Sequence, residues 1–185
     1  MRYPGATTFE GMIIWSARPQ RDPLAPIGEY NVKIKALGQQ KETQFKLEMN
    51  PNLEGVTVED IQKQFDLAIQ IRDKVSEANE AVIQIRSIKE QAMQANGKVN
   101  NSTLKRINDL VSKLSVVEEA LYQVKNQSPQ DPLNFPIKLN NRLASLQRSV
   151  ETGQAKPTNA AYKVFGELSL ELTTQLGLLK QIIET

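Results

Sequence analysis

Three glutamates, Glu10, Glu29 and Glu48, have the side chains from which a glycosidase builds its acid and its nucleophile. That chemistry requires a cleft and two carboxyl groups roughly 5 to 10 Å apart. Glutamates scattered over strands are typical of solvated faces instead. The chain has no His and no Cys, which removes the commonest general base and the usual soft metal ligands. We therefore expect no catalytic residue, no metal and no cofactor.

Trp15 stands at the end of an apolar run, and Arg18 and Arg21 follow it. An indole next to guanidinium groups suits stacking on a sugar or contact with another domain. The other interpretation is that Trp15 belongs to a buried strand and that the two arginines lie in a solvated loop. Both interpretations stay open, and the three residues are candidate interface residues.

Arg72, Asn79 and Arg86 are also candidate interface residues, because they recur at intervals of seven. On a helix they lie on one line, which drifts by only about 20° per step. They could form a polar docking strip beside the apolar stripe. Alternatively, their stems cover the edge of the core while their heads reach acidic residues on neighbouring helices. The acidic residues available for this are Glu118, Glu119, Glu167 and Glu171.

The charge pattern argues against nucleic-acid and membrane partners. Lys and Arg number 23 against 21 Asp and Glu, and the two signs are interspersed, so the net charge of +2 forms no basic track. No apolar run approaches the roughly 18 residues that a membrane span requires. We expect no nucleic-acid binding and no membrane insertion.

The first fifty residues have the pattern of strands and loops. Residues 9–15 are predicted to form a strand buried on both faces, and the prolines of residues 16–27 predict a surface loop. Apolar residues then alternate with polar ones on both sides of Gly38, which predicts a hairpin with one buried face. Two or three strands cannot close a sandwich, so we expect this β-domain to be partial, with its amino-terminal half missing.

From Thr57 the apolar period changes from 2 to 3.6. Thr57 and Thr158 are suitable N-caps, and Asn96-Gly97 supplies a turn. The chain should therefore be α+β and mostly α, with a partial immunoglobulin-like β-domain over residues 1–52 and an antiparallel four-helix bundle over residues 56–185. The helices are predicted near residues 57–95, 102–126, 136–152 and 158–184, and the first is unusually long.

Several phrases of the chain resemble a known family. They are GMIIWSA at 11–17, DPLAP at 22–26, GEYNV at 28–32, QFDLA at 64–68, IRD at 71–73, SEANEAV at 76–82, and Tyr162, Val164, Phe165, Glu167, Leu168 and Ser169. Together they resemble the carboxy-terminal region of large bacterial proteins with a sortilin-like, BNR-repeat β-propeller, which genomes often label glycosyl hydrolase. The resemblance implies an upstream propeller, an exported protein (periplasmic or extracellular) and a chain truncated at both ends. The hydrolase label of that family rests on the propeller, whose repeats do not occur here.

These observations favour a non-catalytic structural and interaction module that packs against an upstream propeller or a partner chain. Two alternatives stay open. One is an accessory part of a carbohydrate-active enzyme, with Trp15 and the proline-rich loop in a glycan site. The other is a helical oligomerisation module, in which the long seams pair between chains as a homo-oligomer.

Overall fold

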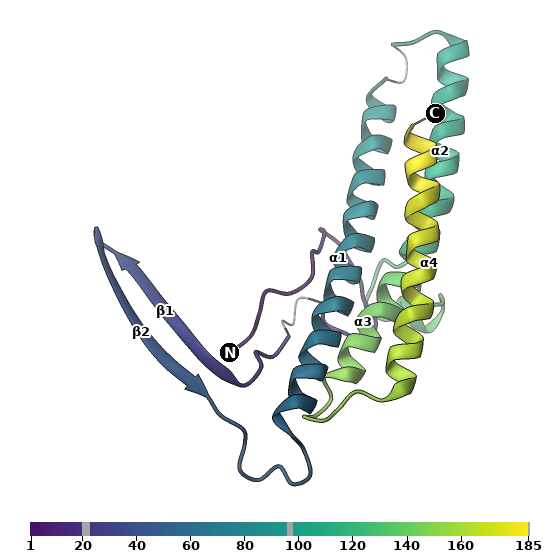
Figure 1. The fold of residues 1–185 in the computed structure, drawn as a ribbon. Coiled ribbons are helices and arrows are strands. Elements are labelled where there is room, and N and C mark those ends of the chain that lie inside the picture. The colour runs from purple at the N-terminus through teal and green to yellow at the C-terminus, as the bar shows by residue number, and fades with distance from the viewer. Residues whose placement is uncertain (20–22, 96–97, 185) are drawn as a thin grey trace.

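A computed structural model describes residues 1–19, 23–95 and 98–184. A β-hairpin is followed by four helices, the first of them long, so the predicted mostly α fold is confirmed (Figure 1). The elements are β1 (Gly28–Ala36), β2 (Gln39–Leu47), α1 (Val58–Ala95), α2 (Asn101–Leu121), the 3-10 helix η1 (Asp131–Leu133), α3 (Leu139–Val150) and α4 (Asn159–Ile183).

Helix α1 begins at the predicted cap. The Asp60 amide donates to Thr57 Oγ1 at 3.1 Å, and the Thr57 amide and hydroxyl donate to Asp60 Oδ2 at 3.1 and 2.8 Å. These reciprocal bonds satisfy free amides of the first turn and hold the pKa of Asp60 below its usual value. The 38 residues of α1 extend for about 57 Å at 1.5 Å per residue. The turn predicted at Asn96-Gly97 lies outside the described residues.

Helices α2 and α3 cover successive halves of α1, and both run antiparallel to it. Near the start of α1, Gln64 Nε2 donates to Val150 O at 2.6 Å, at the end of α3. Near the far end of α1, Arg86 Nε lies 2.8 Å from Glu118 Oε1 of α2. Helix α3 therefore runs in the same direction as α2. The connection between the two helices begins in an extended conformation at Tyr122. Helix α4 lies alongside the others (Figure 1).

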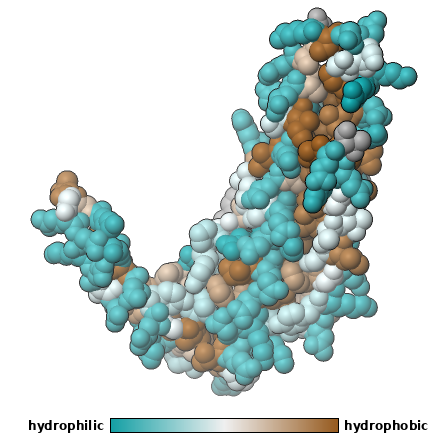
Figure 2. Space-filling model, turned by 45° about the horizontal axis from the view of Figure 1, so that its top comes forward, coloured by the Kyte–Doolittle hydropathy of each residue, from teal (hydrophilic) through white to brown (hydrophobic). Residues whose placement is uncertain are grey.

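The core consists of the aliphatic stripes that the sequence predicts. Each of these side chains stabilises the fold by about 1.5 to 3 kcal/mol when it is fully buried. The largest completely buried apolar residues are Leu67, Ile71, Val75, Val82, Ile85, Leu114, Val117, Leu121, Leu139, Leu143 and Leu172. In the space-filling view hydrophilic side chains cover most of the hairpin, whereas hydrophobic ones gather between the helices (Figure 2). An apolar groove of about 930 Å³ lies between α2 and α4 and includes Ile107, Leu110 and Leu178.

The strand predicted over residues 9–15 is wrong. Residues 4–16, which we call the strap, run in an irregular extended path over the bundle, and Phe9, Met12 and Ile14 pack against the helical core. Outside the hairpin, the described residues form a single isolated bridge, between Arg2 and Leu24. The apolar side chains of this segment are covered by helices and not by neighbouring strands, so no ladder forms.

The hairpin predicted around Gly38 is confirmed, but the prediction that one of its faces is buried is wrong, since no residue of β1 or β2 is buried. Tyr30 pairs with Phe45, their rings stacked at 5.6 Å, and Leu37 and Gly38 turn the chain with φ of 50° and 74°. Both turn residues are left-handed, as a tight two-residue hairpin connection requires. Among the described elements, β1 and β2 contact each other and no helix, and Ile34 of the expected buried face is 61% exposed. The domain division at residues 52–56 stays a prediction.

Candidate interaction site

The three strip residues spaced by seven on α1 all contact the strap. Arg72 Nη1 donates to Pro4 O at 2.9 Å, and Asn79 Nδ2 donates to Thr7 O at 2.7 Å. The Arg86 guanidinium lies over the Phe9 ring, 4.7 Å from its centroid. The regular spacing of the strip therefore matches an extended segment of the same chain that crosses α1 beside its apolar stripe.

Thr7 is held on every side by α1. Its amide donates to Ser76 Oγ at 3.0 Å, and its hydroxyl donates to Glu80 Oε1 at 2.8 Å. With the bond from Asn79 to its carbonyl, both backbone groups of Thr7 and its side chain are satisfied by helical side chains. Such satisfaction is what allows an irregular segment to lie against a helix without leaving unpaired backbone groups.

The second half of the strap is fixed by α3 and by the residue that follows α2. Tyr122 Oη accepts from the Ile13 amide at 3.0 Å. Asn141 Oδ1 accepts from the Trp15 amide at 2.6 Å, and Asn141 Nδ2 donates to the Trp15 carbonyl at 3.0 Å. One amide side chain thus replaces a neighbouring strand for Trp15, since it offers both an acceptor and a donor.

Sequence reasoning missed the role of Asn140 and Asn141. Asparagines are poor residues for a helix interior, so they counted only against the third helix. In the structure both are buried, and Asn140 Nδ2 donates to Asn79 Oδ1 at 3.0 Å, which joins α3 to the strip on α1. The sequence did contain a signal for this role. Two adjacent asparagine side chains lie within a helical stripe that is otherwise aliphatic, and buried amide groups must find hydrogen-bond partners.

Arg86 makes a contact of each kind considered for the strip. Its guanidinium lies over the Phe9 ring of the strap, and it also bonds Glu118 on the neighbouring helix α2. Lys89 Nζ lies 2.6 Å from the other carboxylate oxygen of Glu118. Glu118 is only 5% exposed. Burial by itself raises the pKa of Glu118, but the hydrogen bonds from Lys89 and Arg86 outweigh this effect and hold the pKa below its ordinary value.

We predict that Glu118→Gln destabilises the fold by about 2 to 3 kcal/mol at neutral pH, because it leaves two cations near a neutral amide. A lowered folded-state pKa means that the charge of Glu118 stabilises the fold above the ordinary value of 4.5. This contribution is lost as the pH falls through the lowered pKa. When urea unfolding is measured from neutral pH to about pH 3, the free energy of unfolding should therefore fall less for Glu118→Gln than for the wild type.

Glu119→Gln is the matched control for this prediction, because Glu119 is the exposed neighbour of Glu118 on α2. Its unfolding free energy should follow the wild-type curve at every pH. Parallel pH curves for the wild type and Glu118→Gln would contradict the role given to the buried carboxylate.

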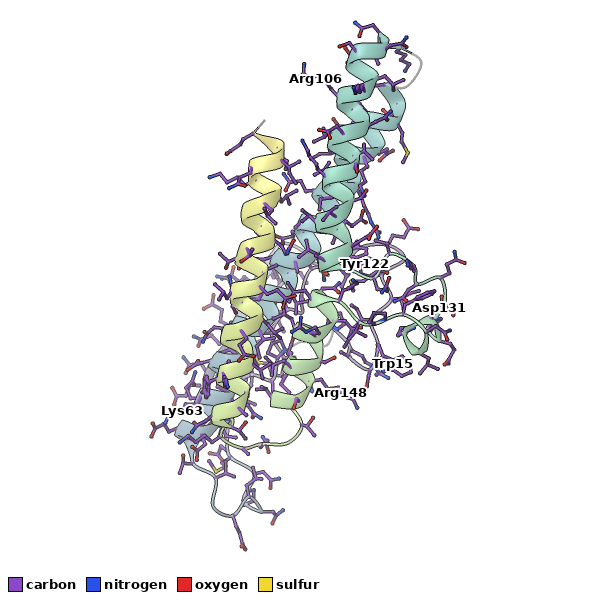
Figure 3. The ribbon with its side chains drawn as sticks, turned by 90° about the vertical axis from the view of Figure 1, so that its right-hand side faces the viewer. Trp15, Lys63, Arg106, Tyr122, Asp131 and Arg148 are labelled. Carbon is purple, nitrogen blue, oxygen red and sulfur yellow. The ribbon has the colours of Figure 1, made fainter. Side chains whose placement is uncertain are left out.

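The remaining candidate residues are not gathered into one site. The Trp15 side chain is 37% exposed and lies at the surface (Figure 3). Arg18 is exposed and lines a polar cavity with Arg148, and Arg21 lies outside the described residues. Trp15 therefore does not belong to a buried strand: its backbone is held by Asn141 and its indole is partly solvated. Its contact with a sugar or with another domain stays a prediction.

The three glutamates considered for glycosidase chemistry lie on different segments. Glu10 is in the strap, Glu29 is in β1 opposite Lys46, and Glu48 follows β2; all three side chains are exposed. Within the described ranges, no cluster of three or more His, Cys, Asp or Glu side chains could hold a metal ion. None of the described helices combines the length and the apolar character that crossing a bilayer requires.

Comparison with known proteins gives no match: no family model, no curated protein and no solved structure is similar to this chain. The function proposed below therefore rests on the geometry of the chain and on the sequence resemblance described above.

Proposed function

We propose that this chain is a non-catalytic structural and interaction module, the carboxy-terminal accessory part of a larger exported β-propeller protein. The observation that carries the proposal is the hairpin, which projects from the bundle without contact to any described helix (Figure 1). Its face with Tyr30, Val32 and Phe45 has the alternation of a covered sheet, but no described element covers it.

A hairpin of this kind is incomplete by its physics. Two strands with both outer edges unpaired are marginally stable in water, and free edges pair readily with other strands. Strands from another β-domain would satisfy the edge amides and bury the apolar face. The helical bundle has its own core and needs no such partner, so it serves as a rigid base for the hairpin.

The resemblance to the BNR-repeat proteins supplies the identity of the partner. It points to an upstream propeller and an immunoglobulin-like sandwich whose last strands would be β1 and β2. The strap supports a mechanical role, because it holds a segment before the hairpin against α1 and α3, and after the hairpin a short connection leads from β2 directly into α1. The hairpin is thereby tied to the bundle on both sides.

Hydrogen–deuterium exchange tests this proposal. In the 185-residue chain we expect the amides of β1 and β2 to exchange far faster than those of α1. When the polypeptide encoded immediately upstream is included, the amides of one outer edge should become protected by about 100-fold or more, as expected for paired strands. Val32→Asp, on the apolar face, should abolish the protection, whereas Lys33→Gln, on the opposite face, should preserve it.

The outcomes separate the alternatives. Hairpin amides that stay unprotected in the longer protein would contradict the proposal. A light-scattering mass of two chains, with protection that appears already in the isolated chain, would favour the homo-oligomer instead. A glycan that alone protects the region around Trp15 would favour the carbohydrate-active alternative.

A further inference from the structure

The apolar stripe of α2 runs along the whole helix, but only its second half is covered. Leu114, Val117 and Leu121 are at most 1% exposed, in the core between the helices. Leu110 and Ile107, one and two turns before Leu114, are only partly buried and line the apolar groove between α2 and α4. Figure 2 shows hydrophobic side chains between the helices at this end of the molecule, away from the hairpin. The first half of the stripe thus stays accessible.

Helix α4 supplies the other wall of this groove, which we call the α2/α4 groove. Leu178 and Ile183 line it and are 43% and 41% exposed. On α2 its lining runs from Ser102 to Lys113, about three turns or roughly 17 Å along the helix. A groove that is apolar on both walls and follows a helix has the shape that receives the apolar face of another helix.

The rim of the α2/α4 groove on α2 is basic. Lys105, Arg106 and Lys113 line it, and Asp109 is the one carboxylate among the described lining residues. Lys113 Nζ lies 2.7 Å from Asp109 Oδ2, so these two charges compensate each other. Lys105 and Arg106 are exposed and form no hydrogen bond or ion pair within the described part of the chain. Two uncompensated cations therefore stand beside the apolar floor.

Lys105 and Arg106 also lie near the end of α2 where a helix disfavours positive charge. The first turn of a helix carries partial positive charge, and acidic side chains stabilise it. Helix α1 has Glu59 and Asp60 in that position, whereas α2 has no acidic residue in its first turn. The described part of the chain thus gives no electrostatic reason for the two cations, and an anionic group from another molecule would supply one.

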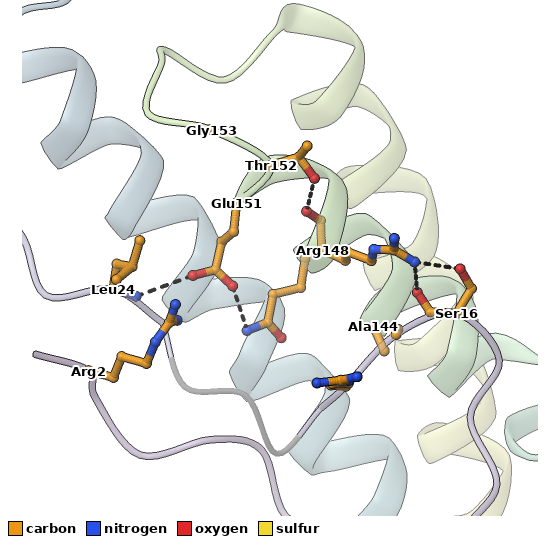
Figure 4. Close-up of a pocket in the computed structure, with 11 residues that line it drawn as sticks. Arg2, Ser16, Leu24, Ala144, Arg148, Glu151, Thr152 and Gly153 are labelled. Atoms are coloured by element: carbon orange, nitrogen blue, oxygen red, sulfur yellow. Dashed lines mark hydrogen bonds between the residues drawn. The ribbon is translucent and has the colours of Figure 1, made fainter. Parts of the chain in front are cut away.

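Other arginines of the bundle are held by the chain itself. Arg148 donates to the carbonyl and the hydroxyl of Ser16 at the wall of the polar cavity beside α3 (Figure 4). Arg142 Nη1 lies 2.7 Å from Glu171 Oε2. Arg106, on the first half of α2, has no such partner among the described residues (Figure 3). Its guanidinium is available to a carboxylate that another molecule brings.

We propose that the α2/α4 groove binds an acidic amphipathic helix of a partner protein. The apolar face of that helix covers Ile107, Leu110 and Leu178, and its flanking carboxylates pair with Lys105 and Arg106. A second copy of this chain fits less well, because a two-fold contact places the same patch on both partners and brings these cations toward each other. The proposal is independent of the hairpin and of its partner.

Fluorescence anisotropy with a labelled synthetic peptide tests the proposal. The probe is a helix of about 18 residues, with leucines at i, i+3, i+4 and i+7 and glutamates beside them. A matched peptide has lysines in place of the glutamates. We expect the 185-residue chain to bind the acidic peptide saturably and the basic peptide at least about tenfold more weakly, because like charges then meet at the rim. The affinity for the acidic peptide should also fall as the salt concentration rises.

Arg106→Glu should weaken binding of the acidic peptide by about tenfold or more and should strengthen binding of the basic peptide. Lys41→Glu is the matched control, since it makes the same change in net charge on the hairpin, which contacts no described helix. It should bind both peptides as the wild type does. Both substituted side chains are exposed, so circular dichroism should show that both variants stay folded.

Three outcomes would overturn the proposal. Equal affinity for the two peptides, or equal affinity of the wild type and Arg106→Glu for the acidic peptide, would exclude an acidic partner. Absence of saturable binding at about millimolar acidic peptide would exclude the groove as a docking site for such a helix. A light-scattering mass of two chains that returns to one chain in Leu178→Gln would show that a second copy occupies the groove.

Discussion

Leu172→Asp should abolish the cooperative unfolding transition of this protein. Leu172 lies on α4, has no exposed surface and belongs to the core formed by all four helices. Truncating such a leucine costs about 2 to 5 kcal/mol, and a buried carboxylate without a partner costs several more. The total is comparable to the whole stability of a domain, about 5 to 15 kcal/mol. Leu114→Asp, completely buried on α2, should have the same effect.

The control lies two residues away on the same helix. Leu170 is 70% exposed, so Leu170→Asp should change the unfolding free energy by no more than about 0.5 kcal/mol. The unfolding transitions of the variants can be compared in urea by circular dichroism at about 222 nm, which follows the helical signal. A normal transition midpoint for Leu172→Asp would show that α4 does not pack as described.

Asn141→Ala should release the second half of the strap while the bundle stays folded. The substitution removes the two hydrogen bonds that hold the backbone of Trp15. We expect it to weaken the binding of the strap to α3 by about 2 to 3 kcal/mol. Trp15 is the single tryptophan of the chain, so its fluorescence reports on the strap alone. Its emission should shift to longer wavelength, and its anisotropy should fall, at urea concentrations where the helical signal is still native.

Asn101→Ala provides the comparison, because Asn101 is an exposed asparagine at the start of α2. Its fluorescence and helical transitions should coincide with those of the wild type. If the two probes also coincide for Asn141→Ala at the wild-type midpoint, the clamp on Trp15 does not hold the strap. Loss of helical structure together with the fluorescence change would mean that the strap is part of the cooperative core.

These two experiments address different levels of the fold. The aliphatic core holds the helices to one another, and polar side chains hold the strap to the helices through its backbone. Burial of apolar surface is tolerant of sequence detail, whereas each clamp depends on one donor or acceptor at one position. The strap should therefore detach before the bundle unfolds.

The helices and the hairpin were predictable because their signals are local. The 3.6-residue stripe and the Thr57 cap define α1 within a residue, and alternation around Gly38 defines β1 and β2. The ends of the second and third helices were less accurate: α2 ends at Leu121 and not near 126, and α3 spans Leu139–Val150 and not 136–152. Helix α2 ends early because the backbone becomes extended at Tyr122, whose hydroxyl binds the strap.

The sequence by itself also determined which residues form the polar strip, since Arg72, Asn79 and Arg86 share one line of α1 by periodicity alone. Only the tertiary structure decided what that line contacts. The clamp of Asn141 on Trp15 joins residues 126 apart, and no local preference encodes such a pairing. An apolar extended segment has the same pattern whether strands or helices cover it, so the path of the strap depends on the surface that the folded bundle offers.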